Sequence, residues 1–120
     1  MATDRAFVTY LVELLAPLDG ITAKRMFGGY GLFREGLMFA LVSDDTLYFK
    51  TDSQTALRFT ERDLEPFTFL KKGEKIRTSY YRAPAEALDN SEEMCAWAAV
   101  AHQVALRAVK PKRPLKRSSQ

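Results

Sequence analysis

Four strand-like runs separated by very short breaks occupy the first half of this 120-residue sequence. The runs cover residues 22–27, 31–34, 37–42 and 47–50, and the breaks fall at Gly28-Gly29, Glu35-Gly36 and Asp44-Asp45. Parallel strands need a crossover of about a dozen or more residues, so connections this short predict antiparallel hairpins. The run 37–42 is apolar at every position, which predicts a central strand covered on both faces.

Helical patterns stand on either side of these runs. Thr3 or Asp4 can cap a first helix, whose apolar stripe extends to Leu18 before Gly20 ends it. A short helix is expected over residues 52–62. The sheet-forming segment is therefore bounded by helix at both ends.

The second half predicts two more strands and a long final helix. Its elements are strands at 67–71 and 75–81, a turn at 72–74 and a short helical segment at 85–88. Asp89, Asn90 or Ser91 caps the last helix. Its predicted buried stripe consists of Met94, Trp97, Ala98, Ala101, Val104, Ala105 and Ala108.

The order of these elements fixes the expected fold class. Strands grouped in blocks between helices predict an α+β fold, in which an antiparallel sheet is packed by the N-terminal and C-terminal helices in two layers. The length suits one domain, which we place at residues 1–109. Residues 110–120 form a basic tail that is expected to be disordered.

The charge of the chain is concentrated in that tail. The net charge is +3, and residues 110–120 contribute +5, which leaves −2 for the rest. The tail cations are Lys110, Lys112, Arg113, Lys116 and Arg117. Such a segment either binds phosphate backbones without sequence specificity or merely solubilises the chain, and the sequence leaves both readings open.

Several classes of protein are excluded or disfavoured. The longest apolar run, residues 95–101, is too short for a membrane span of about 20 residues, and the N-terminus does not resemble a secretory signal. The single cysteine excludes an internal disulfide and is typical of a reducing compartment. We therefore expect a soluble cytoplasmic protein that does not bind membranes.

No catalytic or metal-binding pattern is found. The glycines at 28–31 are followed by another strand and by no Gly-Lys-Ser/Thr, so they predict a tight turn or bulge and not a phosphate loop. Cys95 and His102 lie seven residues apart, whereas metal-ligand pairs on a helix lie three or four apart. We therefore expect no enzyme activity, metal or cofactor.

Basic and aromatic residues are interleaved along the strands, which is typical of contact surfaces. The candidate contact residues are Arg25, Tyr30, Arg34, Arg77, Tyr81 and Arg82, together with the tail cations. Alternation predicts that Arg77 and Tyr81 face one side of the sheet and that Thr78 and Tyr80 face the other. A solvated face, a homodimer contact and nucleic-acid binding all remain open.

The segment Arg25-Met-Phe-Gly-Gly-Tyr-Gly-Leu-Phe resembles the N-terminal domain of the TfoX/Sxy proteins, bacterial regulators of competence for DNA uptake. The resemblance continues through Met38-Phe-Ala-Leu, Leu47-Tyr-Phe-Lys, Glu65-Pro-Phe and Ser79-Tyr-Tyr-Arg-Ala-Pro-Ala-Glu-Ala-Leu-Asp. It implies a two-layer α+β fold similar to secretion chaperones and often dimeric. The full-length regulators, which carry a second, helical domain, are thought to act as coactivators with the cyclic-AMP receptor protein.

Three functional hypotheses follow. The first is a non-enzymatic regulatory domain that acts as a transcriptional coactivator through protein contacts, with weak DNA affinity from the tail. The second is a small-ligand or enzymatic site near residues 28–31 that uses Arg25, Tyr30 and Tyr80. The third is a structural homodimerisation module.

Overall fold

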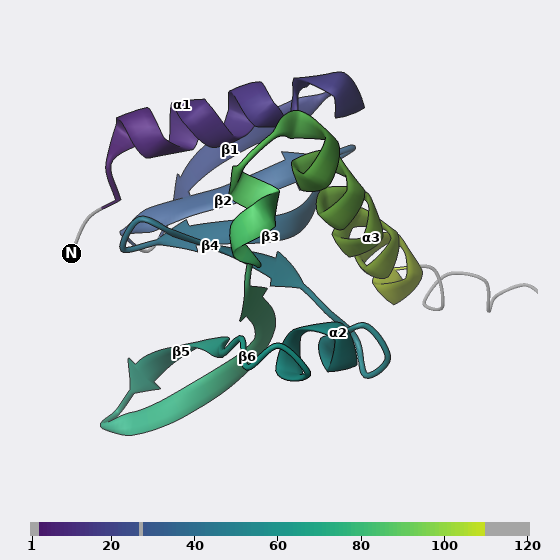
Figure 1. The fold of residues 1–120 in the computed structure, drawn as a ribbon. Coiled ribbons are helices and arrows are strands. Elements are labelled where there is room, and N and C mark those ends of the chain that lie inside the picture. The colour runs from purple at the N-terminus through teal and green to yellow at the C-terminus, as the bar shows by residue number, and fades with distance from the viewer. Residues whose placement is uncertain (1–2, 27, 110–120) are drawn as a thin grey trace, which may run out of the picture.

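A six-stranded antiparallel sheet packs against helices in the computed structural model, which describes residues 3–26 and 28–109 (Figure 1). The strands are β1 (Ile21–Met26), β2 (Gly29–Arg34), β3 (Leu37–Ser43), β4 (Thr46–Lys50), β5 (Pro66–Lys71) and β6 (Glu74–Arg82). Their order across the sheet is β1-β2-β3-β4-β6-β5, and every neighbouring pair is antiparallel. The predicted α+β class with an antiparallel sheet is therefore confirmed.

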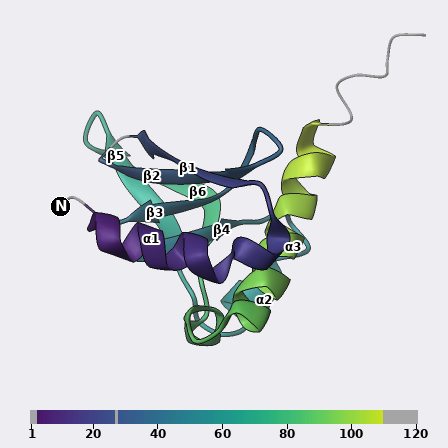
Figure 2. The ribbon, with the colours of Figure 1, turned by 90° about the horizontal axis from the view of Figure 1, so that it is seen from above.

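The helices are α1 (Arg5–Leu14), α2 (Ala56–Thr60) and α3 (Ser91–Val109), with short 3-10 turns η1 (Ala16–Leu18) and η2 (Ala85–Leu88). Asp4 caps α1 by accepting a hydrogen bond from the Ala6 N–H at 2.9 Å. Asn90 accepts from the Glu93 N–H at 2.8 Å at the start of α3. Helices α1 and α3 lie on the same side of the sheet (Figure 2). No helix of the described residues is long and apolar enough to cross a membrane.

Three of the hairpins turn on two residues that both have positive φ. These pairs are Glu35-Gly36, Asp44-Asp45 and Lys72-Gly73. Two consecutive positive φ values are typical of a type I′ turn, whose twist matches that of the flanking strands. The predicted positions of these three turns are confirmed, and β2 begins earlier than expected, at Gly29.

The hydrophobic core fills the space between the sheet and the two long helices. Leu32, Phe39 and Phe49 from the strands are at most 1% exposed, as are Leu11 of α1 and Met94 of α3. The rest of the stripe predicted for α3 contributes to this core except at its end. Ala108 is exposed, because the last turn of α3 extends beyond the strands (Figure 2).

A bulge in β3 decides which of its side chains face the helices. Leu32 pairs with Ala40 and Phe33 with Met38, so Phe39 is the extra residue. Phe39 and Ala40 are both buried, whereas Met38 and Leu41 are half-buried on the other side. The strand is central as predicted, but the expectation that both its faces are covered is wrong, because the helices pack on only one.

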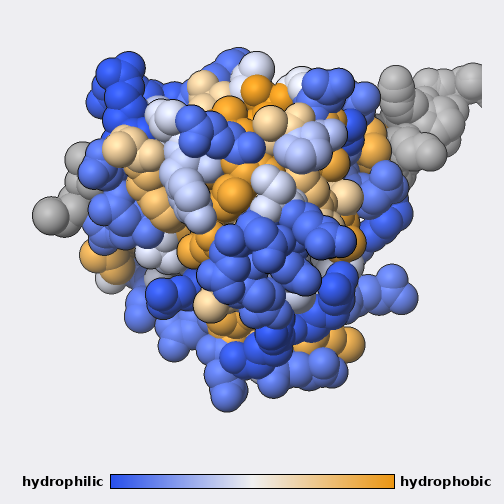
Figure 3. All heavy atoms as spheres, turned by 45° about the horizontal axis from the view of Figure 1, so that its top comes forward, coloured by the Kyte–Doolittle hydropathy of each residue, from blue (hydrophilic) through white to orange (hydrophobic). Residues whose placement is uncertain are grey.

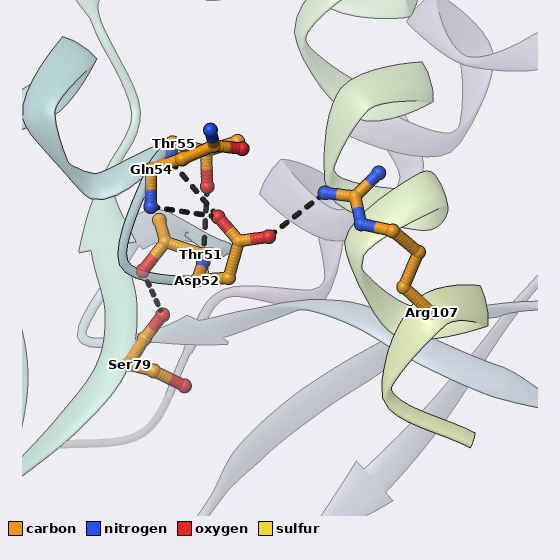
Figure 4. A network of polar contacts seen from close by, with 6 residues as sticks. All are labelled: Thr51, Asp52, Gln54, Thr55, Ser79 and Arg107. Atoms are coloured by element: carbon orange, nitrogen blue, oxygen red, sulfur yellow. Dashed lines mark hydrogen bonds and ion pairs between the residues drawn. The ribbon is translucent and has the colours of Figure 1, made fainter. Parts of the chain in front are cut away.

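A polar network fastens the end of β4 to both β6 and α3 (Figure 4). The Thr51 hydroxyl donates to the Ser79 carbonyl at 2.8 Å. Asp52 accepts from the Thr55 N–H at 2.9 Å and forms an ion pair with Arg107 at 2.8 Å. These contacts hold the C-terminal half of α3 against the sheet.

Candidate interaction surface

A groove of about 360 Å³ lies on the face of the sheet opposite to α1 and α3. Its apolar side chains come from two separate parts of the sheet, β1 to β3 and the β5–β6 hairpin. They include Met26, Met38, Leu41, Phe67, Phe69 and Tyr80. We call this the open-face groove, since no helix within the described ranges covers it. The side that Figure 3 turns to the viewer carries hydrophilic and hydrophobic residues next to one another.

Two glycines of β2 allow neighbouring atoms to come close at one end of the groove. A Cβ atom on Gly29 would lie 2.1 Å from the carbonyl oxygen of Val42, so no larger residue fits there without a shift of the backbone. A Cβ on Gly31 would lie 2.7 Å from the Met38 sulfur and 2.9 Å from the Met26 sulfur. Gly28 supplies the positive φ of the turn before β2, which confirms the tight turn predicted for this glycine segment.

The opposite wall of the groove is a row of aromatic rings. Phe67 contacts Tyr48 edge to face at 5.1 Å between ring centres, and it stacks on Phe69 at 6.4 Å. Thr78 fixes this wall by donating from its hydroxyl to the Phe67 carbonyl at 2.9 Å. The aromatic side chains therefore project from a hydrogen-bonded hairpin.

Three cations lie on the same face of the sheet as the groove. The Lys24 ammonium is 5.1 Å from the centre of the Phe33 ring, and the Lys50 ammonium is 5.2 Å from that of Tyr80. Arg82 is the register partner of Tyr48 on the same face. We call Lys24, Lys50 and Arg82 the groove cations.

Two phenols of the groove face, those of Tyr48 and Tyr80, stay neutral in the physiological range. Burial raises the pKa of Tyr80 above its ordinary value. Burial also raises the pKa of Tyr48, against the opposing charge of Arg82. No carboxylate is among the described residues that line the groove, although Asp44 and Glu65 lie close enough to Tyr48 to raise its pKa.

Two of the predicted contact residues lie on the other face. Arg25 and Tyr30 are register partners on β1 and β2, and with Arg5 and Glu13 of α1 they line a cleft of about 420 Å³. Tyr30 borders both hollows, but Tyr80 lines only the open-face groove. The structure therefore does not bring Arg25 and Tyr80 into one pocket.

Arg34, another predicted contact residue, is half-buried and holds parts of the fold together. Its Nε donates to the Asp19 carbonyl at 3.2 Å, and a terminal nitrogen lies 3.4 Å from Nδ1 of His102. The other ring nitrogen of His102 lies 3.2 Å from the Arg34 carbonyl. His102 thus joins α3 to the end of β2.

The remaining predicted residues fall into three places. Tyr81 is buried, with its ring 5.8 Å from that of Phe59, and Arg77 is exposed on the same side of β6. Arg82 is exposed beside the open-face groove. The predicted alternation along β6 is confirmed, since Thr78 and Tyr80 line the groove. The tail residues Lys110, Lys112, Arg113, Lys116 and Arg117 lie outside the described residues.

Nothing in the described part of the chain resembles a metal centre, since no group of three potential ligands is found there. The Cys95 thiol contacts the Leu14 carbonyl at 3.5 Å, and burial raises the pKa of that thiol. A protonated thiol is a weak nucleophile, so Cys95 is best explained by helix packing. The notable site of the molecule is thus an apolar surface with cations at its edge.

Sequence reasoning singled out Tyr30 and Tyr80 of the groove but missed its methionines and phenylalanines. Met26 and Met38 stand beside the glycine segment in sequence or in register, and Phe67 and Phe69 alternate along one strand. The signal that could have revealed them is the alternation of apolar residues on β5 and β6, on the side opposite to the buried Tyr81.

The comparisons with known proteins agree with this fold. Residues 13–105 match the family described as the TfoX N-terminal domain. The chain is 33% identical over 85 residues to a DNA transformation protein TfoX of Haemophilus influenzae, covering 69% of this chain and 39% of that protein. It is also 40% identical over 64 residues to a DNA transformation protein TfoX1 of Aliivibrio fischeri, and these residues are 53% of this chain and 31% of that protein.

A third relative is the protein Sxy of Escherichia coli, 34% identical over 70 residues, which are 58% of this chain and 34% of that protein. The chain therefore spans between about three and four tenths of the length of the curated relatives that it matches. The match to the family covers most of the described fold, from the end of α1 into the last turns of α3. The chain belongs to the TfoX N-terminal domain family.

Proposed function

We propose that this domain is a non-enzymatic regulatory module that acts in the bacterial cytoplasm as a transcriptional coactivator through contact with another protein. The observation that carries the proposal is its family membership, since two of its relatives are DNA transformation proteins. The apolar open-face groove supports it, because an uncovered apolar surface of this kind is typical of protein interaction sites.

The regulatory role is tested in the native host by deleting the gene and restoring it on a plasmid. We expect the deletion to lower both the transcripts of DNA-uptake genes and the frequency of transformation, and the plasmid copy to restore them. Unchanged transcripts in the deletion strain would contradict the proposed role.

The tail adds a second, weaker contribution, which is affinity for DNA without sequence preference. Five cations that release counterions should steepen the slope of log K against log salt by up to about 4.5. Fluorescence anisotropy with a labelled duplex, measured over a range of salt concentrations, compares the whole chain with a chain lacking residues 110–120. We expect the truncation to remove most of the salt-sensitive binding, and equal binding by the truncated chain would refute this assignment.

Self-association is a second candidate, favoured by the apolar side chains on the open face. Light scattering distinguishes it directly, since a homodimer has twice the chain mass of 13.6 kDa. A monomer at micromolar concentration would count against it.

A further inference from the structure

We infer that the open-face groove binds an amphipathic helix with acidic flanks, supplied by the protein partner. This inference rests on the proposed function, because it names the chemistry of the partner through which that function acts. The two faces of the sheet differ, because α1 and α3 cover one of them and no other described segment covers the groove on the opposite face.

The shape of the groove suits a rod. One wall is formed by β1 to β3 and the other by the β5–β6 hairpin, which turns away from the rest of the sheet (Figure 1). An amphipathic helix places apolar residues at i, i+3, i+4 and i+7 along such a groove. Met26 and Met38 are flexible and polarisable, so they can adapt to the mixed side chains of a helix face.

The accessible rings offer anchoring contacts for such a helix. Phe69 is 42% exposed although it stacks on Phe67, and Leu41 is half-buried at the centre of the sheet. Burial of partly exposed aromatic and aliphatic groups contributes most of the binding energy at interfaces of this kind. An apolar helix face would remove these side chains from water.

Charge complementarity predicts that acidic residues flank the apolar stripe of the partner helix. Lys24 and Lys50 stand over aromatic rings of the groove face, and Arg82 lies opposite Tyr48. Residues 1–109 carry a net charge of −2, given +3 for the chain and +5 for its last eleven residues, so these cations are a local exception to an acidic body. Asp44 and Glu65 act on Tyr48 from the edge of this face, and Glu74 pairs in register with Lys71 at the tip of the hairpin. The groove lining itself is free of carboxylates in the part of the chain described.

The same charges disfavour a second copy of this chain as the occupant. If two open faces met, each would bring its own Lys24, Lys50 and Arg82 to the shared boundary, and like charges at an interface are repulsive. A partner helix with glutamate or aspartate beside its apolar stripe meets those cations with opposite charge. Electrostatic complementarity of this type selects between partners more strongly than it adds affinity.

The test uses two fluorescein-labelled helical peptides of about 18 residues, a length at which isolated helices can form. Both carry the same leucine and phenylalanine stripe, one with glutamate flanks and the other with lysine flanks. We expect the whole chain at low salt to bind the acidic peptide about tenfold more tightly, and the difference to shrink as salt rises. Equal affinities would overturn the inference.

Two charge-reversed proteins form a matched pair. Lys50→Glu with Arg82→Glu alters the groove side of the sheet, whereas Lys75→Glu with Arg77→Glu makes the same change in charge on the opposite side of β6. We expect only the first protein to reverse the preference, so that it binds the lysine-flanked peptide better. Equal responses of the two proteins would overturn the assignment to the groove.

Further measurements separate the outcomes. Thermal melts followed by circular dichroism identify any variant that has lost its fold, and Leu41→Asp then tests the groove without changing a cation. A dimer that the acidic peptide fails to dissociate would reassign the groove to a second copy, and displacement of the peptide by a DNA oligonucleotide would reassign it to nucleic acid. If peptide binding fails while the gene deletion still lowers the transcripts of DNA-uptake genes, the groove inference alone is rejected.

Discussion

The two faces of the sheet carry similar apolar side chains, yet the described chain covers only one of them. Leu32, Phe39 and Phe49 face α1 and α3 and are almost inaccessible to solvent, whereas Leu41 and Phe69 on the other face stay partly exposed. Because strand residues alternate between faces, the same strands build both surfaces. The difference teaches that hydrophobic character alone does not mark the core: on one face it stabilises the fold, and on the other it offers a surface to a partner.

The difference between the faces is tested most directly by replacing one phenylalanine with alanine on each face. Phe39→Ala, at 0% exposure, should lower the free energy of unfolding by about 3–5 kcal/mol, because it leaves a cavity beside α3. Phe69→Ala, at 42% exposure, should lower it by about 1 kcal/mol or less. Urea unfolding at neutral pH measures both. Equal losses would mean that the open face supports the fold as much as the covered face does.

The two glycines of β2 extend the comparison to backbone packing. Gly29→Ala places a Cβ 2.1 Å from the Val42 carbonyl, so β2 and β3 must separate, and we expect a loss of about 1–3 kcal/mol. Gly31→Ala meets side chains and no backbone atom, namely the thioethers of Met26 and Met38 and the edge of the Phe33 ring at 3.0 Å. These side chains can shift, so the substitution should cost about 1 kcal/mol, partly offset by the lower entropy of the unfolded chain. Urea unfolding of the two variants measures both losses in the free energy of unfolding. A larger loss at Gly31 would show that the groove is packed as rigidly as the core.

Much of this architecture was predictable from local patterns. The pairs Glu35-Gly36 and Asp44-Asp45 mark tight turns, and alternation along β6 correctly separates Arg77 from Tyr80. These features depend on residues close together in the chain, so a single sequence reveals them.

The bulge at Phe39 was not predictable in the same way. Residues 37–42 are apolar throughout, so their pattern contains no information about which side chain faces the helices. In the folded chain, the bulge between β2 and β3 lets Phe39 pack against His102 on α3, with ring centres 6.3 Å apart. Such a contact joins residues far apart in sequence. The open-face groove escaped prediction for the same reason, because it depends on where the β5–β6 hairpin lies relative to β1 and β3.

The smallest expected effect on the free energy of unfolding comes from Asp52, whose contact with Arg107 helps to hold α3 on the covered face. Asp52 accepts the Thr55 N–H and pairs with Arg107, and these contacts lower the pKa of its carboxyl from 3.8 to about 2. A lowered pKa in the folded state means that the ionised form stabilises the fold above pH 3.8 and that this contribution is lost as the pH falls towards 2. Because water screens a partly exposed pair, we expect about 1 kcal/mol at neutral pH.

Urea unfolding between pH 7 and pH 2.5 compares the wild type with Asp52→Asn, and Asp63→Asn makes the same chemical change at an exposed turn. The difference in free energy of unfolding between the wild type and Asp52→Asn should be largest at neutral pH and should narrow below pH 3.8 as Asp52 takes up a proton. Asp63→Asn should track the wild type throughout. If the difference for Asp52→Asn stays constant down to pH 2.5, the ionised carboxylate does not stabilise the contact between α3 and the end of β4, and α3 is held on the covered face by its apolar side chains and by His102.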